Sequence, residues 1–158
     1  MLQLSHVIKR YPGGAEALNR ISFSLEKGEM AFITGPSGAG KSTLFRLIAL
    51  MERPTQGQII LDGQNLSGLP IRKIAHMRRK LGMIFQDYKL LEQRTVFENV
   101  ALPLIVSGYE PNEIRGRVSA SLDLVSLLDK EQRYPLSLSG GEQQRVGIAR
   151  ALVHKPKL

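Results

Sequence analysis

The sequence predicts an α/β fold that contains an inserted block of helices, and three observations lead to this fold class. The first 30 residues hold strand-like runs with apolar residues at every second position, as in "ISFSLEKGE". A short apolar run, "MAFITG", then leads into a glycine-rich loop and the helix-forming run "KSTLFRLIALME". From Thr95 onward, apolar residues recur every three or four positions, which is typical of amphipathic helices.

Short turn sequences separate the elements of the first half. "LQLSHVIKRY" is followed by a "PGG" turn, and "GQIILDGQNL" reads as two strands joined by Asp-Gly, a dipeptide typical of hairpins. We expect a short basic helix at "PIRKIAHMRRK" and another strand at "LGMIFQD". The helix that starts at Lys41 should end before Pro54, because proline disfavours helix in the residue before it.

Helical patterns dominate the second half of the chain. In "TVFE", the Thr95 hydroxyl and the Glu98 carboxylate can each satisfy a free backbone N–H, which predicts a capping box at a helix start. The apolar residues of the next helix are spaced by four, four and three: Ile114, Val118, Leu122 and Val125. Residues 90 to 135 therefore form a predicted all-helical insertion in the α/β core.

Composition narrows the class of protein. Of the 158 residues, 42% are hydrophobic and 23% are charged, which is ordinary for a globular domain, and no residue is cysteine. A disulfide framework and a thiolate metal site are therefore excluded. No stretch reaches the run of about 18 apolar residues that a membrane span needs. A function at a membrane would require a partner.

The net charge is +8, from 22 basic and 14 acidic residues. Basic proteins often bind nucleic acid. The densest basic cluster, "RKIAHMRRK", has no interleaved aromatic residues on which bases could stack. We therefore expect no nucleic-acid partner and interpret the charge as a solvated face, helped by phosphate-binding residues and a nearby anionic leaflet.

The strongest motif is "GPSGAGKS", which matches G-x-x-x-x-G-K-[ST] at every fixed position. It lies between a predicted strand and a predicted helix, which is the context that this phosphate-binding loop requires. Glycines let successive backbone N–H groups point inward, and the helix start adds partial positive charge. Lys41 is expected to reach the β- and γ-phosphates of a nucleoside triphosphate, and the Ser42 hydroxyl is expected to bind Mg²⁺.

A second candidate anion site lies at "LSGGEQQR". Ser139 and Glu142 form a capping box, and Val146, Ala149 and Val153 continue on one helical face. The residues alone also allow an ordinary capped helix. Two glycines weaken a helix start by roughly 1 kcal/mol each relative to alanine, however, and a cap does not need them.

"LSGGEQQR" resembles the signature of ATP-binding-cassette (ABC) ATPases, and "GPSGAGKST" and "FQD" precede it in that family's order. The resemblance covers the whole chain. It implies a P-loop NTPase core of the ABC type with an antiparallel β subdomain and an inserted all-helical subdomain, the C-terminal part of the core being absent. The implied domains are residues 1–89 for the nucleotide-binding core, 90–135 for the helical subdomain and 136–158 for the signature motif with its helix.

This resemblance implies an ATPase that converts ATP and water to ADP and phosphate with Mg²⁺. In the family two subunits form a head-to-tail homodimer, with each ATP between one subunit's phosphate loop and the other's signature. The implied residues for the subunit's own ATP are Gly35, Pro36, Ser37, Gly38, Ala39, Gly40, Lys41, Ser42 and Thr43. Those for the partner's ATP are Ser139, Gly140, Gly141 and Glu142. Lys41, Gln86 and Ser139 are the implied catalytic residues.

Further roles follow from position in the family pattern. Tyr11 matches an aromatic residue that stacks on adenine, and Gln86 matches a glutamine that reaches Mg²⁺ and the attacking water. For Tyr11, the alternative to this role is a strand-end tyrosine packed on the core. Two positions depart from the pattern: Leu50 stands where relatives often have glycine, and Pro36 lacks the N–H that could donate to phosphate.

Longer segments, such as "LGMIFQDYKLLEQRTVFENVALPLIVSG", are most similar to the cell-division branch of the family. The resemblance implies a peripheral protein on the cytoplasmic face of the bacterial inner membrane, with an integral membrane partner that docks on the helical subdomain. Lipoprotein-release and MacB-type efflux ATPases are near relatives, and a non-hydrolytic nucleotide-gated scaffold is a further alternative. Chromosome-associated ATPases carry coiled-coil insertions, and none occurs between the two motifs.

The family pattern continues beyond "HKPKL" to a strand that ends in a magnesium-supporting Asp and a water-activating Glu. We therefore interpret the sequence as the N-terminal portion of a longer protein. A sheet without its later strands exposes apolar edges. We expect these 158 residues alone to be poorly stable and not to hydrolyse ATP at a useful rate.

Overall fold

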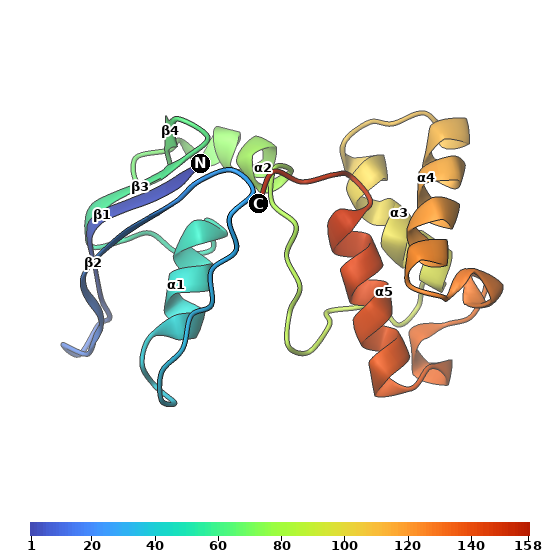
Figure 1. Cartoon of the computed structure of the whole chain (residues 1–158), viewed down its shortest axis with the longest axis horizontal. Coiled ribbons are helices and arrows are strands. Elements are labelled where there is room, and N and C mark those ends of the chain that lie inside the picture. The colour runs from blue at the N-terminus through green and yellow to red at the C-terminus, as the bar shows by residue number, and fades with distance from the viewer. The chain divides into compact units, whose positions relative to one another are not determined.

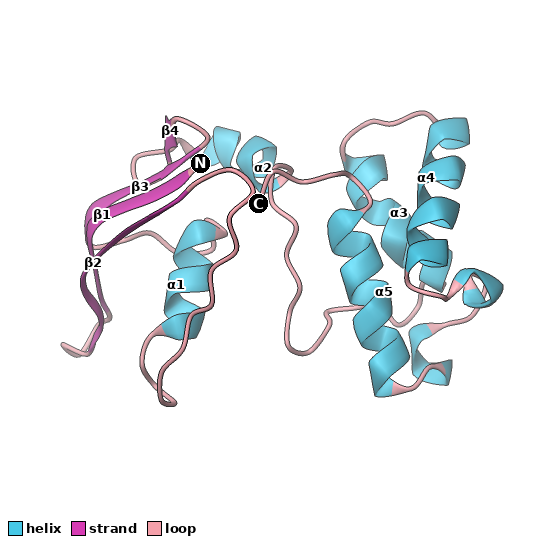
Figure 2. Cartoon of the chain, viewed as in Figure 1, coloured by secondary structure: helices cyan, strands magenta, loops and turns pink.

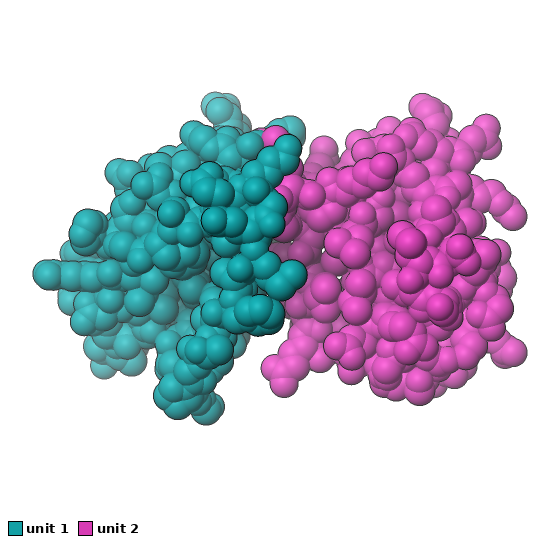
Figure 3. All heavy atoms as spheres, viewed as in Figure 1, with its two compact units in different colours: residues 1–78 teal, residues 79–158 magenta.

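A computed structural model describes residues 1–158 and divides them into two units, 1–78 and 79–158 (Figure 3). The first unit contains β1 (Leu2–Arg10), β2 (Glu16–Leu25), α1 (Lys41–Ile48), β3 (Gln56–Leu61), β4 (Gln64–Asn65) and α2 (Ile71–Arg78). The second contains α3 (Val96–Val106), α4 (Pro111–Leu124), the 3-10 turns η1 (Leu128–Lys130) and η2 (Pro135–Ser137), and α5 (Gly140–Leu152). Figures 1 and 2 show these elements. None of the helices combines the length and the apolar character that crossing a membrane requires.

The first unit contains an antiparallel sheet, as predicted. Its strands lie in the order β2-β1-β3-β4 (Figure 1). The central strand β1 places Leu4 opposite Phe23 of β2 and Ile59 of β3. The turn between β3 and β4 has Asp62 and Gly63 at φ values of 52° and 75°, the left-handed pair that a type I′ hairpin requires. The predicted Asp-Gly hairpin is therefore confirmed.

Helix α1 ends at Ile48, four residues before the end of the predicted run. Leu50 has a left-handed φ of 57°, and the N–H groups of Leu50 and Met51 donate to the carbonyls of Leu47 and Arg46. This pair of bonds is a Schellman motif, in which glycine usually occupies the left-handed position. Leu50 stands there because its side chain is buried, which stabilises the unit by about 2 kcal/mol and offsets a left-handed cost of about 1–2 kcal/mol.

The two strands predicted at "MAFITG" and "LGMIFQD" are wrong, since residues 30–35 and 81–85 are not strands. A strand needs a hydrogen-bonded neighbour. No backbone hydrogen bond joins residues 30–34 to another segment, and Met30 and Phe32 are 82% and 86% exposed. The second segment pairs only at its start, where the Gly82 N–H donates to the Leu158 carbonyl at 2.7 Å.

The second unit is a helical unit built around one apolar cluster from α3, α4 and α5. Its fully buried members include Val100 of α3, Leu122 of α4 and Val146 of α5. Helix α4 stops before the end of the predicted run because Ser126 turns into a left-handed conformation at a φ of 57°. The predicted domain boundaries, after residues 89 and 135, stay a prediction.

Both predicted capping boxes are confirmed. At α3, the Glu98 N–H donates to the Thr95 hydroxyl at 3.2 Å, and the Thr95 N–H donates to the Glu98 carboxylate at 2.8 Å. Helix α3 also contains Asn99, a polar side chain with no exposed surface. Its amide accepts from the Leu91 N–H at 2.8 Å and donates to the Leu91, Arg94 and Thr95 carbonyls at 2.9–3.1 Å. Asn99 therefore ties the loop before α3 to the helix.

Replacing Asn99 by alanine should lower the free energy of unfolding of the helical unit by about 3 kcal/mol, because buried backbone groups of the loop lose their partners. Chemical denaturation followed by circular dichroism measures this change. Asn112→Ala, at an exposed position on α4, is the matched control and should change the stability by less than about 0.5 kcal/mol. Equal effects of the two substitutions would contradict the assigned role of Asn99.

Candidate functional site

The glycine-rich motif of the first unit, residues 35–43, comprises a loop, residues 35–40, that joins segment 30–34 to α1, and the first three residues of that helix. Gly40, the residue before α1, has a φ of 84°, and a Cβ atom there would lie 2.2 Å from the Ala17 carbonyl oxygen of β2. Any side chain would therefore both strain the backbone and collide with the sheet. Glycine lets the loop pass against β2 and turn directly into the helix.

The N-terminus of α1 has neither a capping side chain nor an acidic residue in its first turn. The first N–H groups of a helix have no partner within the helix, and together with the helix dipole they attract anions. The Leu44 N–H is the first to bond back, to the Gly40 carbonyl at 2.9 Å. The N–H groups of Lys41, Ser42 and Thr43 are thus free for an external acceptor such as phosphate.

Lys41 and Ser42 provide the side-chain chemistry of this loop. The Lys41 ammonium donates to the Gly35 and Pro36 carbonyls, each at 2.7 Å, so it lies over the loop. The Ser42 side chain is exposed and makes no hydrogen bond within the protein. The chain contains no cluster of His, Cys, Asp or Glu that could hold a metal by itself. A magnesium ion at Ser42 would take most of its ligands from phosphate and water, as is usual for this ion.

Tyr11 lies beside the first turn of α1, since its hydroxyl is 3.4 Å from Thr43 Oγ1. The Lys9 ammonium covers one face of its ring, 5.0 Å from the centroid, and pairs with Glu52 at 3.1 Å. Burial raises the pKa of Glu52, but the Tyr11 hydroxyl and Lys9 outweigh it and lower that pKa. The ring is therefore held in place next to the phosphate-binding loop, as the predicted contact with a base requires.

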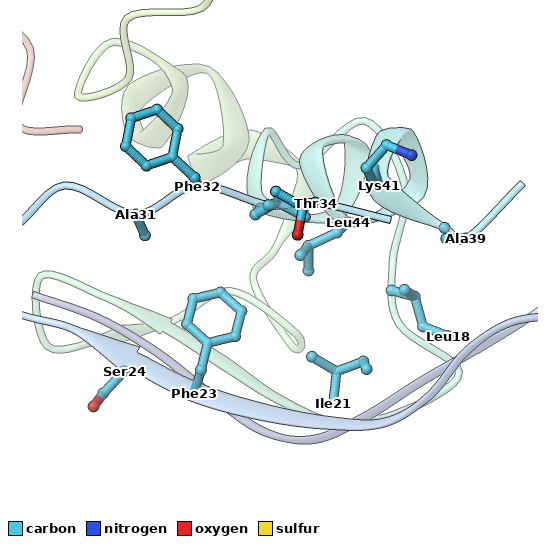
Figure 4. A pocket seen from close by; sticks show the side chains of 12 residues that line it. Leu18, Ile21, Phe23, Ser24, Ala31, Phe32, Thr34, Ala39, Lys41 and Leu44 are labelled. Carbon is cyan, nitrogen blue, oxygen red and sulfur yellow. The ribbon is translucent and has the colours of Figure 1, made fainter. Parts of the chain in front are cut away.

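A cavity of about 530 Å³ adjoins the loop in the first unit (Figure 4). Ile21 and Phe23 of β2 point into it from one side, and Leu44 of α1 from the other (Figure 4). Phe32, on segment 30–34, points away from the sheet. The lining is largely apolar, so the polar groups of the site are those of the loop and not of this cavity.

The other predicted site residues belong to the second unit, 79–158. Gln86 is exposed and makes no hydrogen bond within the protein. It begins the Gln86 loop (residues 86–89), in which Tyr88 and Lys89 both have left-handed φ values, 55° and 47°. Ser139, Gly140, Gly141 and Glu142 form the α5 tip (residues 139–142).

The α5 tip is closed by a complete capping box. The Glu142 carboxylate accepts from the Ser139 N–H at 2.8 Å and from the Ser139 hydroxyl at 2.9 Å, while its other oxygen bonds the Lys130 ammonium. Lys130, ahead of the Ser139 backbone, lowers the pKa of Glu142 to about 2. At neutral pH the tip therefore carries an ionised carboxylate that is paired with a lysine.

Gly140 and Gly141 have no steric role within this chain. Neither has a positive φ, and a Cβ atom on either would come no closer than 3.9 Å to another atom. Alanine would favour the helix by roughly 1 kcal/mol at each position. The bare backbone of the α5 tip is thus suited to the close approach of another molecule.

Comparison with known proteins agrees with these features. The family model described as ABC transporter matches residues 18–158. Over 99% of the chain, the sequence is 55% identical to the cell division ATP-binding protein FtsE of Escherichia coli, of which the match covers 70%. It is also 48% identical to the methionine import ATP-binding protein MetN 1 of Listeria monocytogenes, over the whole chain and 48% of that protein.

Solved structures show the same likeness. A dimeric post-hydrolysis state of an ATP-binding cassette, bound to ADP and Pi, matches 99% of the chain and 71% of its own length with a TM-score of 0.92 and 36% identity. CbiO1 from Clostridium perfringens, part of the ABC transporter complex cbiONQ, matches 99% of the chain and 62% of its own length with a TM-score of 0.88 and 30% identity.

The chain belongs to the ABC transporter family and is an ATP-binding subunit of that class, an ATPase. The predicted fold class is thereby confirmed. The residues present fit ATP and Mg²⁺, because the open N-terminus of α1, the Lys41 ammonium and the unpaired Ser42 hydroxyl provide donors and a ligand. The roles of the individual site residues stay predictions.

The sequence did not predict two residues that contact the candidate site. Lys130 contacts the α5 tip, and Arg150 contacts the Gln86 loop. Lys130 lies 12 residues before Glu142, and Arg150 lies 61 residues after Lys89. No local pattern indicates contacts across such separations. The only sequence signal was the capping-box position of Glu142, which indicates Ser139 as its partner and not Lys130.

The two glycines of the α5 tip yield a test that separates folding from function. Gly140→Ala and Gly141→Ala should leave the protein as stable or more stable. On the expectation that the tip receives the nucleotide of a second subunit, both should abolish ATP-dependent dimerisation, because the added methyl group would occupy that space. Thermal unfolding and analytical ultracentrifugation with ATP measure the two effects. Gly116→Ala on α4, also with no neighbour within 4 Å, is the control and should leave dimerisation intact.

The Glu142 carboxyl yields a prediction about pH. Since its pKa is lowered from 4.5 to about 2, its stabilising effect is complete above about pH 4.5 and is lost as the pH falls toward 2. Lys130→Met should raise the pKa of Glu142 toward its ordinary value, with only the Ser139 bonds remaining. A carbon-13 titration of the carboxyl group by NMR measures this pKa. The same pKa in both proteins would rule out the ion pair as its main cause.

Proposed function

We propose that the protein is the ATP-binding subunit of a membrane-bound complex of bacterial cell division, most similar to FtsE acting with FtsX. The subunit works as a head-to-tail homodimer on the cytoplasmic face of the inner membrane. An integral membrane protein resembling FtsX docks on the helical subdomain, residues 90–135. The complex regulates peptidoglycan hydrolysis at the septum. The 55% identity to FtsE of Escherichia coli and 49% identity to FtsE of Bacillus subtilis support this branch of the family.

One observation carries the dimeric site, namely the contrast between two helix starts. The N-terminus of α1 is uncapped and has a lysine above it, so it can bind a triphosphate by itself. The α5 tip is already capped by its own carboxylate, yet it keeps two glycines that its own fold does not require. A second copy of the chain that brings its bound nucleotide to this tip accounts for both.

In the proposed mechanism, the N–H groups of residues 41–43 and the Lys41 ammonium bind the phosphates, and Tyr11 orients the base. Ser42 and Gln86 would hold a magnesium ion, which would supply neutralisation of the negative charge on the γ-phosphate. Gln86 orients the attacking water. Ser139 of one subunit turns its hydroxyl proton from Glu142 toward the partner's γ-phosphate, so that binding closes the dimer and hydrolysis reopens it.

Two alternatives differ in the partner or the chemistry. The methionine-import relative and the lipoprotein-release and MacB-type ATPases favour a subunit that drives transport of a solute. A non-hydrolytic scaffold would need nucleotide binding alone. Substituting Lys41 cannot separate motor from scaffold, because both lose the nucleotide.

The test uses the full-length protein reconstituted in liposomes with an integral membrane protein that resembles FtsX. Lys41→Ala should lower ATP turnover at least about 100-fold, because the phosphates lose their main cationic partner. Gln86→Ala should bind ATP within about threefold of the wild type and hydrolyse it at least about tenfold more slowly. A malachite-green phosphate assay and equilibrium binding of labelled ATP measure these quantities.

The same variants separate the alternatives in cells. With a motor in cell division, both Lys41→Ala and Gln86→Ala should give filamentous cells, measured as mean cell length. A scaffold would tolerate Gln86→Ala. Cells that lack the protein would instead support a transporter if they divide normally but fail to export or import a solute.

A further inference from the structure

Arg150, near the C-terminal end of α5, reaches from that helix to the Gln86 loop. Its guanidinium donates to the Lys89 carbonyl at 2.7 Å and, through the second terminal nitrogen, to the Tyr88 carbonyl. Two adjacent carbonyls that accept from the two arms of one guanidinium form a forked contact, which a lysine ammonium cannot reproduce.

The loop itself needs such a contact. Tyr88 and Lys89 are consecutive left-handed residues, a conformation that residues other than glycine keep only when their surroundings hold them. Within the loop, the Tyr88 N–H donates to the Phe85 carbonyl at 3.1 Å, and the Lys89 ammonium pairs with Asp87 at 2.7 Å on the surface. An exposed pair of this kind contributes little. The Arg150 contact joins Tyr88 and Lys89 directly to α5.

Arg150 is partly buried and forms no ion pair with a carboxylate. Burial lowers the pKa of its guanidinium, which reflects the cost of removing the charge from water. The two loop carbonyls are therefore its compensating partners.

The helix that carries Arg150 is itself fixed. Val146 and Ala149 are buried in the core of the second unit, and the Ser121 hydroxyl of α4 donates to the Ala149 carbonyl at 3.0 Å. Toward the other end of the helix, the Tyr88 hydroxyl is the atom nearest to a Cβ atom placed on Gly140, at 3.9 Å. The loop thus lies along α5, from Arg150 to the α5 tip.

We propose that Arg150 is a positioning residue that fixes the Gln86 loop to α5, so that the loop and the α5 tip move as one body. The inference rests on the proposed function, in which Gln86 serves the subunit's own ATP and the α5 tip serves the partner's. The contact then links the two nucleotides of the dimer within each subunit: a change at Gln86 is transmitted to the tip that faces the other ATP.

The test measures hydrogen exchange and kinetics in the full-length protein. In Arg150→Met, the amides of the Gln86 loop, residues 86–89, should exchange about tenfold faster, since the loop loses both hydrogen bonds from the guanidinium. Its kcat for ATP should fall about tenfold while its KM changes less than about twofold, because the phosphate-binding loop is untouched. Arg150→Lys keeps the positive charge and one donor group, so its exchange rate and its kcat should lie between those of the wild type and of Arg150→Met. This second variant keeps the test valid if Arg150→Met does not fold.

Arg115→Met on α4, exposed and without a hydrogen bond, is the matched control and should change neither exchange nor kinetics. Unchanged exchange of residues 86–89 in folded Arg150→Met would overturn the proposal. So would equal acceleration of exchange over the whole helical unit, because that pattern indicates a merely structural role. The proposed function fails if the ATPase activity of the wild type does not depend on the concentration of dimer. The hydrogen-exchange result decides separately whether Arg150 holds the loop.

Discussion

The burial of one face of α5 is the constraint on which the second unit depends. Val146, Ala149 and Val153 pack into the cluster formed with α3 and α4, and this packing fixes both the direction and the rotation of the helix. Everything attached to α5 then has a defined place, including the α5 tip and Arg150. An apolar helix face therefore determines where polar groups are presented.

The N-termini of α1 and α5 differ in how their first backbone N–H groups find acceptors. At α1 the N–H groups are left open within one chain, and glycine at position 40 is required by the close approach to β2. At α5 the Glu142 N–H has an acceptor in the same chain, the Ser139 hydroxyl, and the two glycines leave space for an approaching molecule. The first arrangement suits a resident ligand, and the second suits a ligand that arrives with another molecule.

Local sequence patterns predicted the features that depend on neighbours in the chain. The capping boxes at Thr95 and Ser139 and the Asp-Gly hairpin need only residues a few positions apart, and all three are present. The strands expected at residues 30–35 and 81–85 depend on partners elsewhere, and apolar composition alone did not supply them. The contacts of Lys130 and Arg150 escaped prediction for the same reason, since their partners are distant in sequence.

The ion pair at the α5 tip changes the electrostatic potential that an incoming nucleotide would meet. A helix start carries the equivalent of about +0.5 elementary charge, and the ionised Glu142 alone would reverse its sign. Lys130 cancels the carboxylate charge and leaves the field of the helix itself directed outward. The tip can thus be rigidly closed by an acidic side chain and still attract a polyanion.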